Sequence, residues 1–587
     1  MAPRRLAAAG SVFLGTRGSP APRPPRRPYS GAGAGRERAF YVTTPVFYAN
    51  AAPHVGHLYS AVTADCLHRY KLLRGFDSRF ATGTDEHGLK IQQAADAANT
   101  EPLAFCTEVS DKFRVLFRTC GVAHTDYVRT TEDRHRRAVQ HFWALLRGKG
   151  LIYRGSYRGW YSTQDESFLT PGQVADGTDA AGDPVKVSVE SGHKVEWTEE
   201  ENYMFRLSQF RPRLRRWLGE NPGAVRPEKF RRLVLRWLEE DLPDLSVSRQ
   251  GSRLRWGVGV PGDPRQTVYV WLDALVSYLT VLGYPGDCSY WWNAAHHVVG
   301  KDILKFHAIY WPAFLMGAGL PLPRAIHVHS HWTVGGKKMS KSLGNVVDPV
   351  ERSQKFSADG LRYFLLRQGV ADSDCDYDDG KVAKVLNSEL ADALGGLLNR
   401  CTAPSLNPAQ VHPRFCAGCF PKEPRRGSAG RAAPEDYRML DSVAALPGVV
   451  ARHLEDVQVY KALDAIGGCV RQTNGFVQRH APWKLGGGGE DRSWHATVLH
   501  VSLECLRIYG TLLQPAVPEL ADRLLSRLGV RREERTWEAA RRFLPRFHGE
   551  DSALEGRALG PHRGVLFARL EPSPGHHKGR EVRRAAK

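Results

Sequence analysis

The chain has 587 residues, of which 42% are hydrophobic and 25% are charged, a composition typical of a globular protein with several domains. No apolar run reaches the roughly 18 residues of a membrane-spanning helix. The nearest candidate, residues 308–322, contains Pro312, so we expect a buried helix rather than a membrane span. The formal net charge of +20 at pH 7 suits a polyanionic partner such as RNA, although solubility alone would explain it equally well.

Part of this charge lies at the N-terminus, where residues 1–36 contain seven Arg, three Ser and no acidic residue. Such a composition predicts a mitochondrial transit peptide, and hence a location in the mitochondrial matrix. A disordered basic arm is the alternative. A secretory signal is disfavoured because the segment lacks an apolar h-region.

Residues 37–150 alternate buried strands with helices. The pattern predicts two strands and one long helix, at residues 39–44, 78–82 and 55–73. Strands that alternate with helices indicate an α/β fold with a doubly wound parallel, Rossmann-like sheet. Residues 151–245 are poorer in apolar side chains and are interpreted as an insertion. The α/β pattern then returns in residues 246–345, so one domain is split by an inserted module.

The pattern becomes purely helical after residue 380. Apolar residues recur at helical spacing in three stretches, at residues 382–401, 449–480 and 497–513. We therefore predict an all-α domain over 381–545, preceded by a linker over 346–380 and followed by a basic C-terminal tail over 546–587. A Pro- and Gly-rich loop is expected at 403–434.

Ten cysteines are scattered along the chain, and only Cys416 and Cys419 have a recognisable spacing. A single CxxC without a second ligand pair is weak support for a metal or redox site. We interpret the remaining cysteines as reduced and mostly buried.

Two histidines and a glycine, His54, Gly56 and His57, stand where a predicted strand gives way to a predicted helix. The start of a helix offers free N–H groups and the positive end of the helix dipole, which suit a phosphate. His54 and His57 share one helix face and could stabilise charge that develops on phosphate oxygens. On its own this HxGH pattern is weak.

A second motif, KMSKS, runs from Lys338 to Ser342 and follows Gly335 and Gly336. A loop rich in glycine and lysine can close over a polyphosphate. Alone it could equally be a solvated basic loop. The order of the two motifs, HxGH early in a split α/β domain and KMSKS at its end, resembles the class I aminoacyl-tRNA synthetases.

Four further segments resemble methionyl-tRNA synthetases in particular, over about residues 40–485. They are YVTTPVFYAN (41–50), TGTDEHG (82–88), YVWLDA (269–274) and GKDI (300–303). The resemblance implies a methionine pocket formed by Val46, Tyr48, Asp85, Trp271, Ala274, Tyr278, Phe306 and His307. Aromatic walls suit a polarisable thioether, and the Asp85 carboxylate suits the substrate ammonium.

The resemblance also implies a reaction in two steps, with ATP, methionine and tRNA(Met) as substrates. Methionine attacks the α-phosphate of ATP, and the methionyl group then passes to the 3′ end of the tRNA. His54, Gly56 and His57 would bind the nucleotide, with Lys301 nearby. Lys338 and Lys341 would neutralise the leaving pyrophosphate, and Mg²⁺ is expected with ATP.

The helical domain would read the anticodon, and the linker would contact the tRNA stem. Arg400, Asn399 and Trp483 match or adjoin positions that the family uses for this purpose. An exposed aromatic ring can stack on an unpaired base. Gly396 departs from the pattern, because many relatives have an Asn there that helps to read the anticodon.

Two further departures concern metal and assembly. Ser162 and Asp165 stand where relatives with a zinc knuckle have cysteines, so we expect no structural zinc in the insertion. The appended domain that makes some relatives dimeric is not seen, so we expect a monomer.

Three alternatives remain open at this point. One is a shorter kind of HxGH nucleotidyltransferase, which would not need a helical anticodon module. Another is a catalytically silent RNA-binding paralogue, which would predict decay of motif residues that are intact here. A third is a cytosolic rather than a mitochondrial synthetase.

Overall fold

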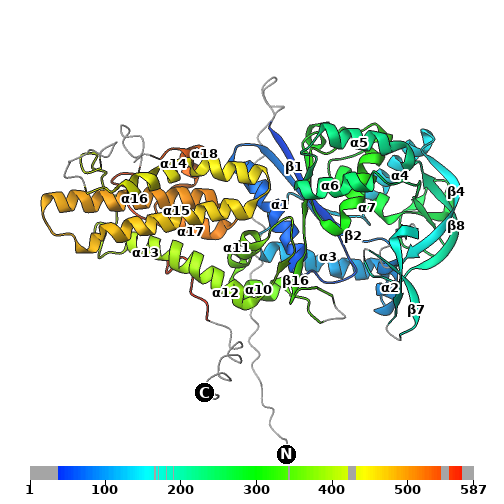
Figure 1. Ribbon diagram of the computed structural model, residues 1–587, viewed down its shortest axis with the longest axis horizontal. Coiled ribbons are helices and arrows are strands. Elements are labelled where there is room, and N and C mark those ends of the chain that lie inside the picture. The colour runs from blue at the N-terminus through cyan, green and yellow to red at the C-terminus, as the bar shows by residue number, and fades with distance from the viewer. Residues whose placement is uncertain are drawn as a thin grey trace, which may run out of the picture. The chain divides into compact units, whose positions relative to one another are not determined.

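The computed structural model describes residues 38–163, 167–169, 171–179, 182–189, 191–340, 344–420, 431–543 and 554–571 (Figure 1). The predicted transit peptide and Lys341 lie outside these residues, so nothing structural is derived for them.

Six parallel strands form the central sheet, in the order β3-β2-β1-β14-β15-β9. Their bounds are Asp126–Arg129 (β3), Asp77–Asp85 (β2), Ala39–Tyr48 (β1), Ala295–Gly300 (β14), Ala325–His329 (β15) and Val225–Arg226 (β9). From β1 the chain moves outward to β2 and β3, and it later returns to β14 on the other side of β1. The order therefore reverses between β1 and β14, and in such sheets ligands bind at the carboxyl ends of the strands at that point.

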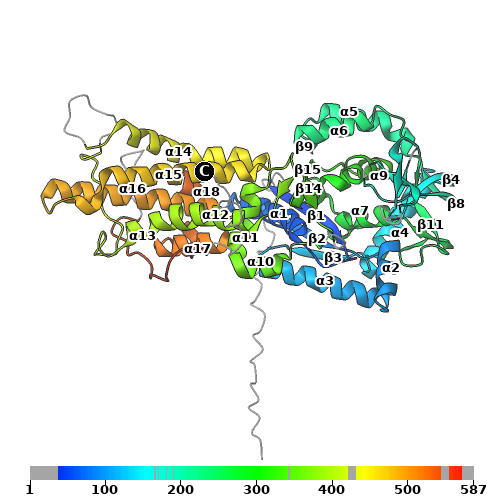
Figure 2. The same ribbon diagram turned by 60° about the horizontal axis from the view of Figure 1, so that its bottom comes forward.

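Helices cover both faces of this sheet (Figures 1 and 2). Successive strand residues point to opposite faces, so Val42 packs with helices α1 (Val55–Leu73) and α3 (Pro102–Thr119), whereas Tyr41 packs on the other side. That other face is covered by α4 (Asp133–Gly148), α7 (Val270–Thr280) and α9 (Trp311–Ala318). The predicted doubly wound parallel fold is confirmed.

Between residues 152 and 268 the chain forms mainly antiparallel sheets, which continue past the expected end of the insertion at residue 245. One has the order β10-β8-β4-β5, another the order β11-β13-β12, and a third pairs β6 with β7. Their bounds are Leu245–Ser246 (β10), Glu196–Phe205 (β8), Ile152–Ser162 (β4), Ser167–Leu169 (β5), Ser248–Gln250 (β11), Asp263–Val268 (β13), Gly259–Val260 (β12), Val174–Thr178 (β6) and Pro184–Ser188 (β7). Two helices, α5 (Arg211–Glu220) and α6 (Glu228–Trp237), flank β9, which leaves the insertion and joins the main sheet as its sixth strand.

The C-terminal half is helical. Its helices are α10 (Pro349–Phe356), α11 (Ala358–Gln368), α12 (Asp379–Leu386), a π-helical segment (Asn387–Gly395), α13 (Gly396–Thr402), α14 (Pro434–Glu455), α15 (Val459–His480), α16 (Gly489–Leu513), α17 (Pro518–Arg527) and α18 (Trp537–Arg541). The helix predicted over 449–480 is wrong in one respect, because it breaks between Glu455 and Val459. Val457 takes a positive φ of 56° there, which a continuous helix does not allow.

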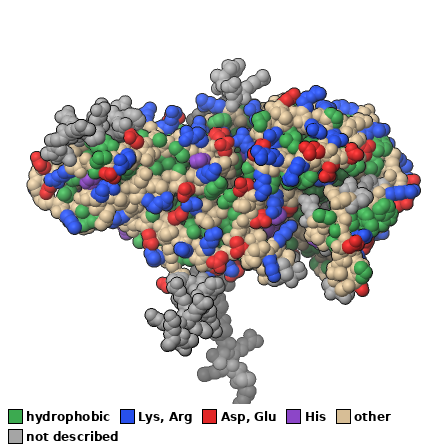
Figure 3. Space-filling view, viewed as in Figure 1, with side chains coloured by type: hydrophobic (Ala, Val, Ile, Leu, Met, Phe, Trp, Pro, Cys, Tyr) green, Lys and Arg blue, Asp and Glu red, His purple; other side chains and the backbone are tan. Residues whose placement is uncertain are grey.

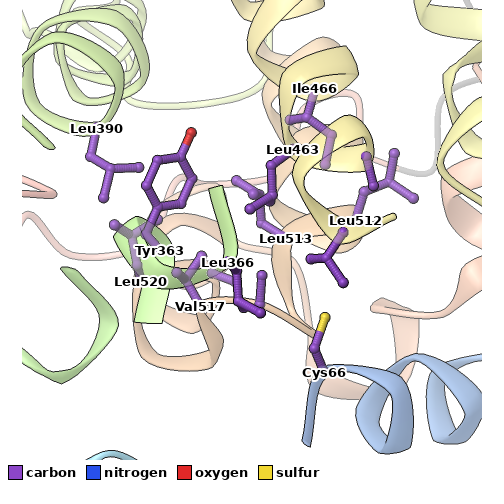
Figure 4. Close-up of a cluster of buried hydrophobic side chains, with 14 of the residues drawn as sticks. Cys66, Tyr363, Leu366, Leu390, Leu463, Ile466, Leu512, Leu513, Val517 and Leu520 are labelled. Atoms are coloured by element: carbon purple, nitrogen blue, oxygen red, sulfur yellow. The ribbon is translucent and has the colours of Figure 1, made fainter. Parts of the chain in front are cut away.

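Helix α1 shares a core with the helical half (Figure 4). Cys66 of α1 lies in the same buried cluster as Leu366 of α11, Leu463 of α15 and Leu513 of α16. An ion pair and a hydrogen bond reinforce this junction. The buried Arg362 guanidinium of α11 lies 2.6 Å from Asp65 of α1 and also donates to the Ala516 carbonyl before α17.

Part of the predicted basic tail is packed against the helical half. Leu554 and Leu566 are buried, and Asn387 and Leu570 exchange two hydrogen bonds of 2.8 and 2.9 Å. In the described part of the chain, no helix is long and apolar enough to cross a membrane. Lys and Arg side chains are interspersed with Asp and Glu over the face shown in Figure 3.

Candidate active site

His54 and His57 cap the start of helix α1, at the carboxyl end of β1. The Nδ1 atom of His54 accepts the Gly56 N–H, and the Nδ1 atom of His57 accepts the His54 N–H, both at 3.0 Å. This reciprocal pattern is a capping box, here built from imidazoles instead of the usual Ser and Glu. A Cβ atom at Gly56 would lie 2.8 Å from the His54 ring, so the glycine makes room for His54 itself.

Both histidines are neutral at pH 7. Burial lowers the pKa of His54 to about 4, partly opposed by the Asp302 charge and assisted by Lys338. Burial and the neighbouring His54 also lower the pKa of His57 well below its usual value. Because each Nδ1 accepts a hydrogen bond, the proton of each neutral ring is assigned to Nε2. The two imidazoles are thus arranged to donate hydrogen bonds from Nε2 to a bound anion.

The KMSKS motif begins in a small sheet beside these histidines. The strands are β16 (Trp332–Val334), β17 (Lys337–Lys338) and β18 (Cys375–Asp376), with β16 between the other two. Gly335 and Gly336 form the connecting turn with φ of 59° and 73°, a conformation that favours glycine. Asp376 accepts the Gly336 N–H at 2.9 Å and so fixes the turn.

The two motifs meet although about 280 residues of sequence separate them. The Met339 Cε lies 4.0 Å from where a Cβ at Gly56 would be, and the Val55 N–H donates to the Val347 carbonyl at 3.2 Å. Lys338 is exposed and lies close enough for its charge to lower the pKa of His54. Lys341 lies outside the described residues.

Lys301, a candidate for binding ATP, follows β14 at the same edge of the sheet. Its Nζ lies 2.7 and 2.9 Å from the two oxygens of the Asp374 carboxylate, which also accepts the His331 N–H. Lys301 is therefore held by a carboxylate in this structure and would have to share that partner to bind phosphate.

The eight candidate methionine residues come from four elements that surround the switch point. Val46, Tyr48 and Asp85 lie at the ends of β1 and β2; Trp271, Ala274 and Tyr278 lie on α7; Phe306 and His307 follow β14. The Trp271 and Phe306 rings stack with centroids 3.7 Å apart and planes 9° apart. His307 contacts the Ile303 carbonyl through Nδ1 at 2.9 Å and the Tyr278 hydroxyl through Nε2 at 2.7 Å. A carbonyl only accepts, so Nδ1 carries the proton and the Tyr278 hydroxyl donates to Nε2.

A buried charge network supports this region, and no sequence motif indicates which residues form it. Asp273 is fully buried, and its two oxygens lie 2.6 Å from His87 Nδ1 and 2.6 Å from His135 Nε2. Burial alone would raise the pKa of Asp273, but the two histidines outweigh it and bring the pKa to about 2. Asp273 lies between candidate pocket residues on α7, and His87 lies two residues after Asp85. The network thus ties two sides of the candidate pocket together.

Glu86 supports the same loop by a second set of contacts. Its fully buried carboxylate accepts hydrogen bonds from Arg129 and Thr131, each at 2.6 Å, and from Thr84 at 2.7 Å. Glu86 lies within the TGTDEHG motif, which by itself does not indicate this supporting role.

The candidate anticodon residues lie on two helical elements. Arg400 of α13 donates to the Gly396 carbonyl at 3.2 Å and to the Asn474 side chain of α15. Trp483 is 43% exposed, in a short turn that follows α15, and Asn399 is partly exposed. A Cβ at Gly396 would meet only the Ala391 carbonyl, at 3.9 Å, so the backbone leaves room for the Asn of relatives.

The inserted sheet places Ser162 at the end of β4, whereas Asp165 lies outside the described residues. Among the residues that the structure describes, no group of three or more His, Cys, Asp or Glu side chains could hold a metal ion.

Comparisons with known proteins agree with the fold. Residues 40–402 match a family described as class I tRNA synthetases (M), and residues 427–548 match the anticodon binding domain of methionyl tRNA ligase. The mitochondrial methionine--tRNA ligase of Takifugu rubripes is 68% identical over 535 residues, which cover 91% of this chain and 90% of the relative. The mitochondrial enzyme of Homo sapiens is 60% identical over 539 residues, covering 91% of each chain.

A solved structure shows the same fold. Mycobacterium tuberculosis methionyl-tRNA synthetase in complex with methionyl-adenylate superposes with a TM-score of 0.82 at 36% sequence identity, covering 90% of this chain and 99% of that one. The split Rossmann-like domain and its two motifs are those of a class I aminoacyl-tRNA synthetase. Within that class, the chain belongs to the mitochondrial methionine--tRNA ligases. The predicted family is confirmed.

Proposed function

We propose that the chain activates L-methionine with ATP, releases pyrophosphate, and transfers the methionyl group to the 3′ end of mitochondrial tRNA(Met). The family establishes a mitochondrial methionine--tRNA ligase. The observation that carries the site assignment is the meeting of the HxGH and KMSKS motifs at the switch point of the sheet. A nucleotide bound there would lie at the start of helix α1.

The phosphates of ATP would be bound mainly by hydrogen bonds rather than by charged histidines. Neutral His54 and His57 would donate from Nε2, and these bonds strengthen as negative charge builds up in the transition state. Lys338 and Lys341 supply positive charge for the leaving pyrophosphate. Lys301 would also bind a phosphate oxygen while it keeps its ion pair with Asp374. The described residues offer no preformed cluster for a cation. Mg²⁺ would therefore be bound largely by ATP oxygens and would screen their charge.

Methionine would be held by its two ends. The Asp85 carboxylate pairs with the ammonium group, while Trp271, Phe306 and Tyr278 surround the thioether. The Tyr278 hydroxyl is committed to His307, which keeps this wall fixed. An apolar pocket distinguishes one methylene by only about 1–3 kcal/mol, so homocysteine should be activated at a low rate.

The anticodon would be read by Trp483, Arg400 and Asn399. Stacking on one base contributes about 1–3 kcal/mol, so Trp483→Ala should raise the KM for tRNA by roughly 5- to 150-fold. Methionine-dependent ATP–pyrophosphate exchange should stay unchanged, because that step needs no anticodon. Trp197→Ala is a matched control, since Trp197 is also exposed but lies on the inserted sheet. Equal effects of the two substitutions on tRNA would refute the assignment.

The decisive test is ATP–pyrophosphate exchange with protein that lacks residues 1–36, measured with each of the twenty amino acids. Exchange with methionine alone, lost in Lys341→Ala but retained in the exposed control Lys112→Ala, supports the site. Absence of exchange with every amino acid in folded protein would refute it. Sedimentation analysis of the same preparation tests the proposed monomer, and import of a fluorescent fusion with and without residues 1–36 tests the proposed transit peptide.

A further inference from the structure

Cys416 and Cys419 lie in a turn between helices α13 and α14, away from the catalytic motifs in sequence. The Cys416 carbonyl accepts the Cys419 N–H at 3.1 Å and the Phe420 N–H at 3.3 Å. In a turn of this kind, the first and fourth Cα atoms lie within about 7 Å of each other. A disulfide requires a Cα separation of about 4.4–6.8 Å, so the backbone is already close to the geometry of a bridge.

These two thiols differ from the other eight cysteines of the chain. Seven of the others are buried: Cys66, Cys106, Cys120, Cys288, Cys401, Cys469 and Cys505. Cys375 is partly exposed, but its S–H donates a hydrogen bond to the Gln368 carbonyl at 3.3 Å, and burial raises the pKa of its thiol. Cys416 and Cys419 are both partly exposed and stand next to each other, so solvent reagents can reach the pair.

The surroundings assign different roles to the two thiols. Cys419 donates its S–H to Cys416, the Gly418 and Cys419 N–H groups also point at Cys416, and Arg414 is nearby, so the pKa of Cys416 is lowered. Burial and the neighbouring Cys416 raise the pKa of Cys419 to about 11. The thiolate is the reactive form of cysteine, and therefore Cys416 is the nucleophile of the pair.

We propose that Cys416 and Cys419 form a redox-active dithiol that exchanges with a small disulfide of the glutathione type. The Cys416 thiolate attacks one sulfur of the oxidised glutathione, forming a mixed disulfide and expelling one glutathione thiolate. The Cys419 sulfur, after losing its proton to solvent, then attacks Cys416 Sγ and expels the second glutathione thiolate. The protein loses two electrons and two protons, and one oxidised glutathione becomes two reduced ones.

The dithiol is connected by packed rings to the candidate anticodon surface. Phe420, next to Cys419, is fully buried and stacks on Trp494 with ring centroids 6.0 Å apart. Trp494 contacts the His480 ring at 4.8 Å, and His480 ends α15 just before the turn that carries Trp483. Closing the bridge should therefore raise the KM for tRNA and leave methionine-dependent exchange unchanged. This second step depends on the proposed function of Trp483, whereas the disulfide chemistry does not.

The test is titration of the protein lacking residues 1–36 with mixtures of reduced and oxidised glutathione, followed by alkylation and peptide mass analysis. We expect a Cys416–Cys419 disulfide in the wild type. The Cys419→Ser variant should hold one glutathione on Cys416, because the resolving thiol is missing. The Cys416→Ser variant should hold none on Cys419, and Cys375→Ser should behave as the wild type.

Two results would overturn the proposal. One is full alkylation of both thiols in excess oxidised glutathione. The other is equal glutathione trapping by Cys419→Ser and Cys416→Ser, which would show that neither thiol is the preferred nucleophile. Methionine-dependent exchange, measured on every variant, verifies that each is folded. An unchanged KM for tRNA in fully oxidised protein would refute the link to the anticodon surface.

Discussion

Replacing Asp273 with asparagine removes the charge at the centre of the His87–Asp273–His135 network. In the native protein the carboxylate accepts hydrogen bonds from both rings at 2.6 Å, and all three side chains are buried. An asparagine has one acceptor oxygen, and its NH₂ group would face a ring nitrogen that carries a proton. One hydrogen bond is therefore lost unless that histidine changes its tautomer.

The magnitude follows from the pKa of Asp273. Its value of about 2 lies below the ordinary 3.8 because the two histidines outweigh the effect of burial. Because folding lowers the pKa of Asp273, its ionised carboxylate stabilises the folded protein. This contribution is fully present above pH 3.8 and is lost as the pH falls toward 2. At about 1.4 kcal/mol for each tenfold change in proton affinity, the contribution to the free energy of unfolding is about 2–3 kcal/mol at pH 7. Breaking a buried charge network costs about 3–5 kcal/mol in other proteins. We therefore expect Asp273→Asn to lower the free energy of unfolding by about 2–4 kcal/mol.

Urea unfolding at pH 7.5 of protein lacking residues 1–36 measures this loss. The KM for methionine in pyrophosphate exchange should rise as well, because Asp273 positions both α7 and the loop after Asp85. Asp111→Asn, at an exposed position on α3, serves as the control. A change in the free energy of unfolding below about 0.5 kcal/mol, together with an unchanged KM, would refute the positioning role.

Asp359, Arg362 and His54 lie outside this network, and each allows a separate test. Burial raises the pKa of Asp359 to about 6, although its carboxylate accepts the Leu520 N–H at 2.6 Å. The charged form of Asp359 therefore opposes folding. The free energy of unfolding should increase as the pH falls from 7 toward 4. Asp359→Asn should then stabilise the protein at pH 7.5 by up to about 3 kcal/mol, and a lower midpoint of thermal unfolding than the wild type would contradict this. Arg362→Met removes the guanidinium that lies 2.6 Å from the buried Asp65, which keeps only Arg69 at 2.8 Å as an ionic partner, and should cost about 2–4 kcal/mol in urea unfolding. Adding Asp65→Asn to that variant should recover part of the loss, and a purely additive double variant would argue against the pairing. Because the pKa of His54 is about 4, pyrophosphate exchange should show no titration of this ring between pH 6 and 8; an inflection near pH 6.5 that disappears in His54→Ala would show that the ring is charged in the working enzyme.

Local sequence determined the strands and the helix that hold the candidate active-site residues. The helix predicted at 55–73 is observed as Val55–Leu73, with His54 as its capping residue. The strands predicted at 39–44 and 78–82 extend to Ala39–Tyr48 and Asp77–Asp85. Strand ends are set by partners in the sheet, and a single strand does not reveal them.

Only the tertiary structure decided which distant residues meet. Strand β9 is two residues long, too short for any periodic signal, and becomes part of the main sheet only because β15 lies beside it. His135 carries no motif, yet it completes the charge network of Asp273 across 138 residues. Gly56, which the resemblance assigned to nucleotide binding, is found to make room for the ring of His54. The sequence alone determined the class of protein, the order of its motifs and the local caps and periodicities, since these depend on neighbours along the chain. The tertiary structure decided protonation states, buried ion pairs and strand partners, since these depend on desolvation and on contacts that form only when remote segments pack together.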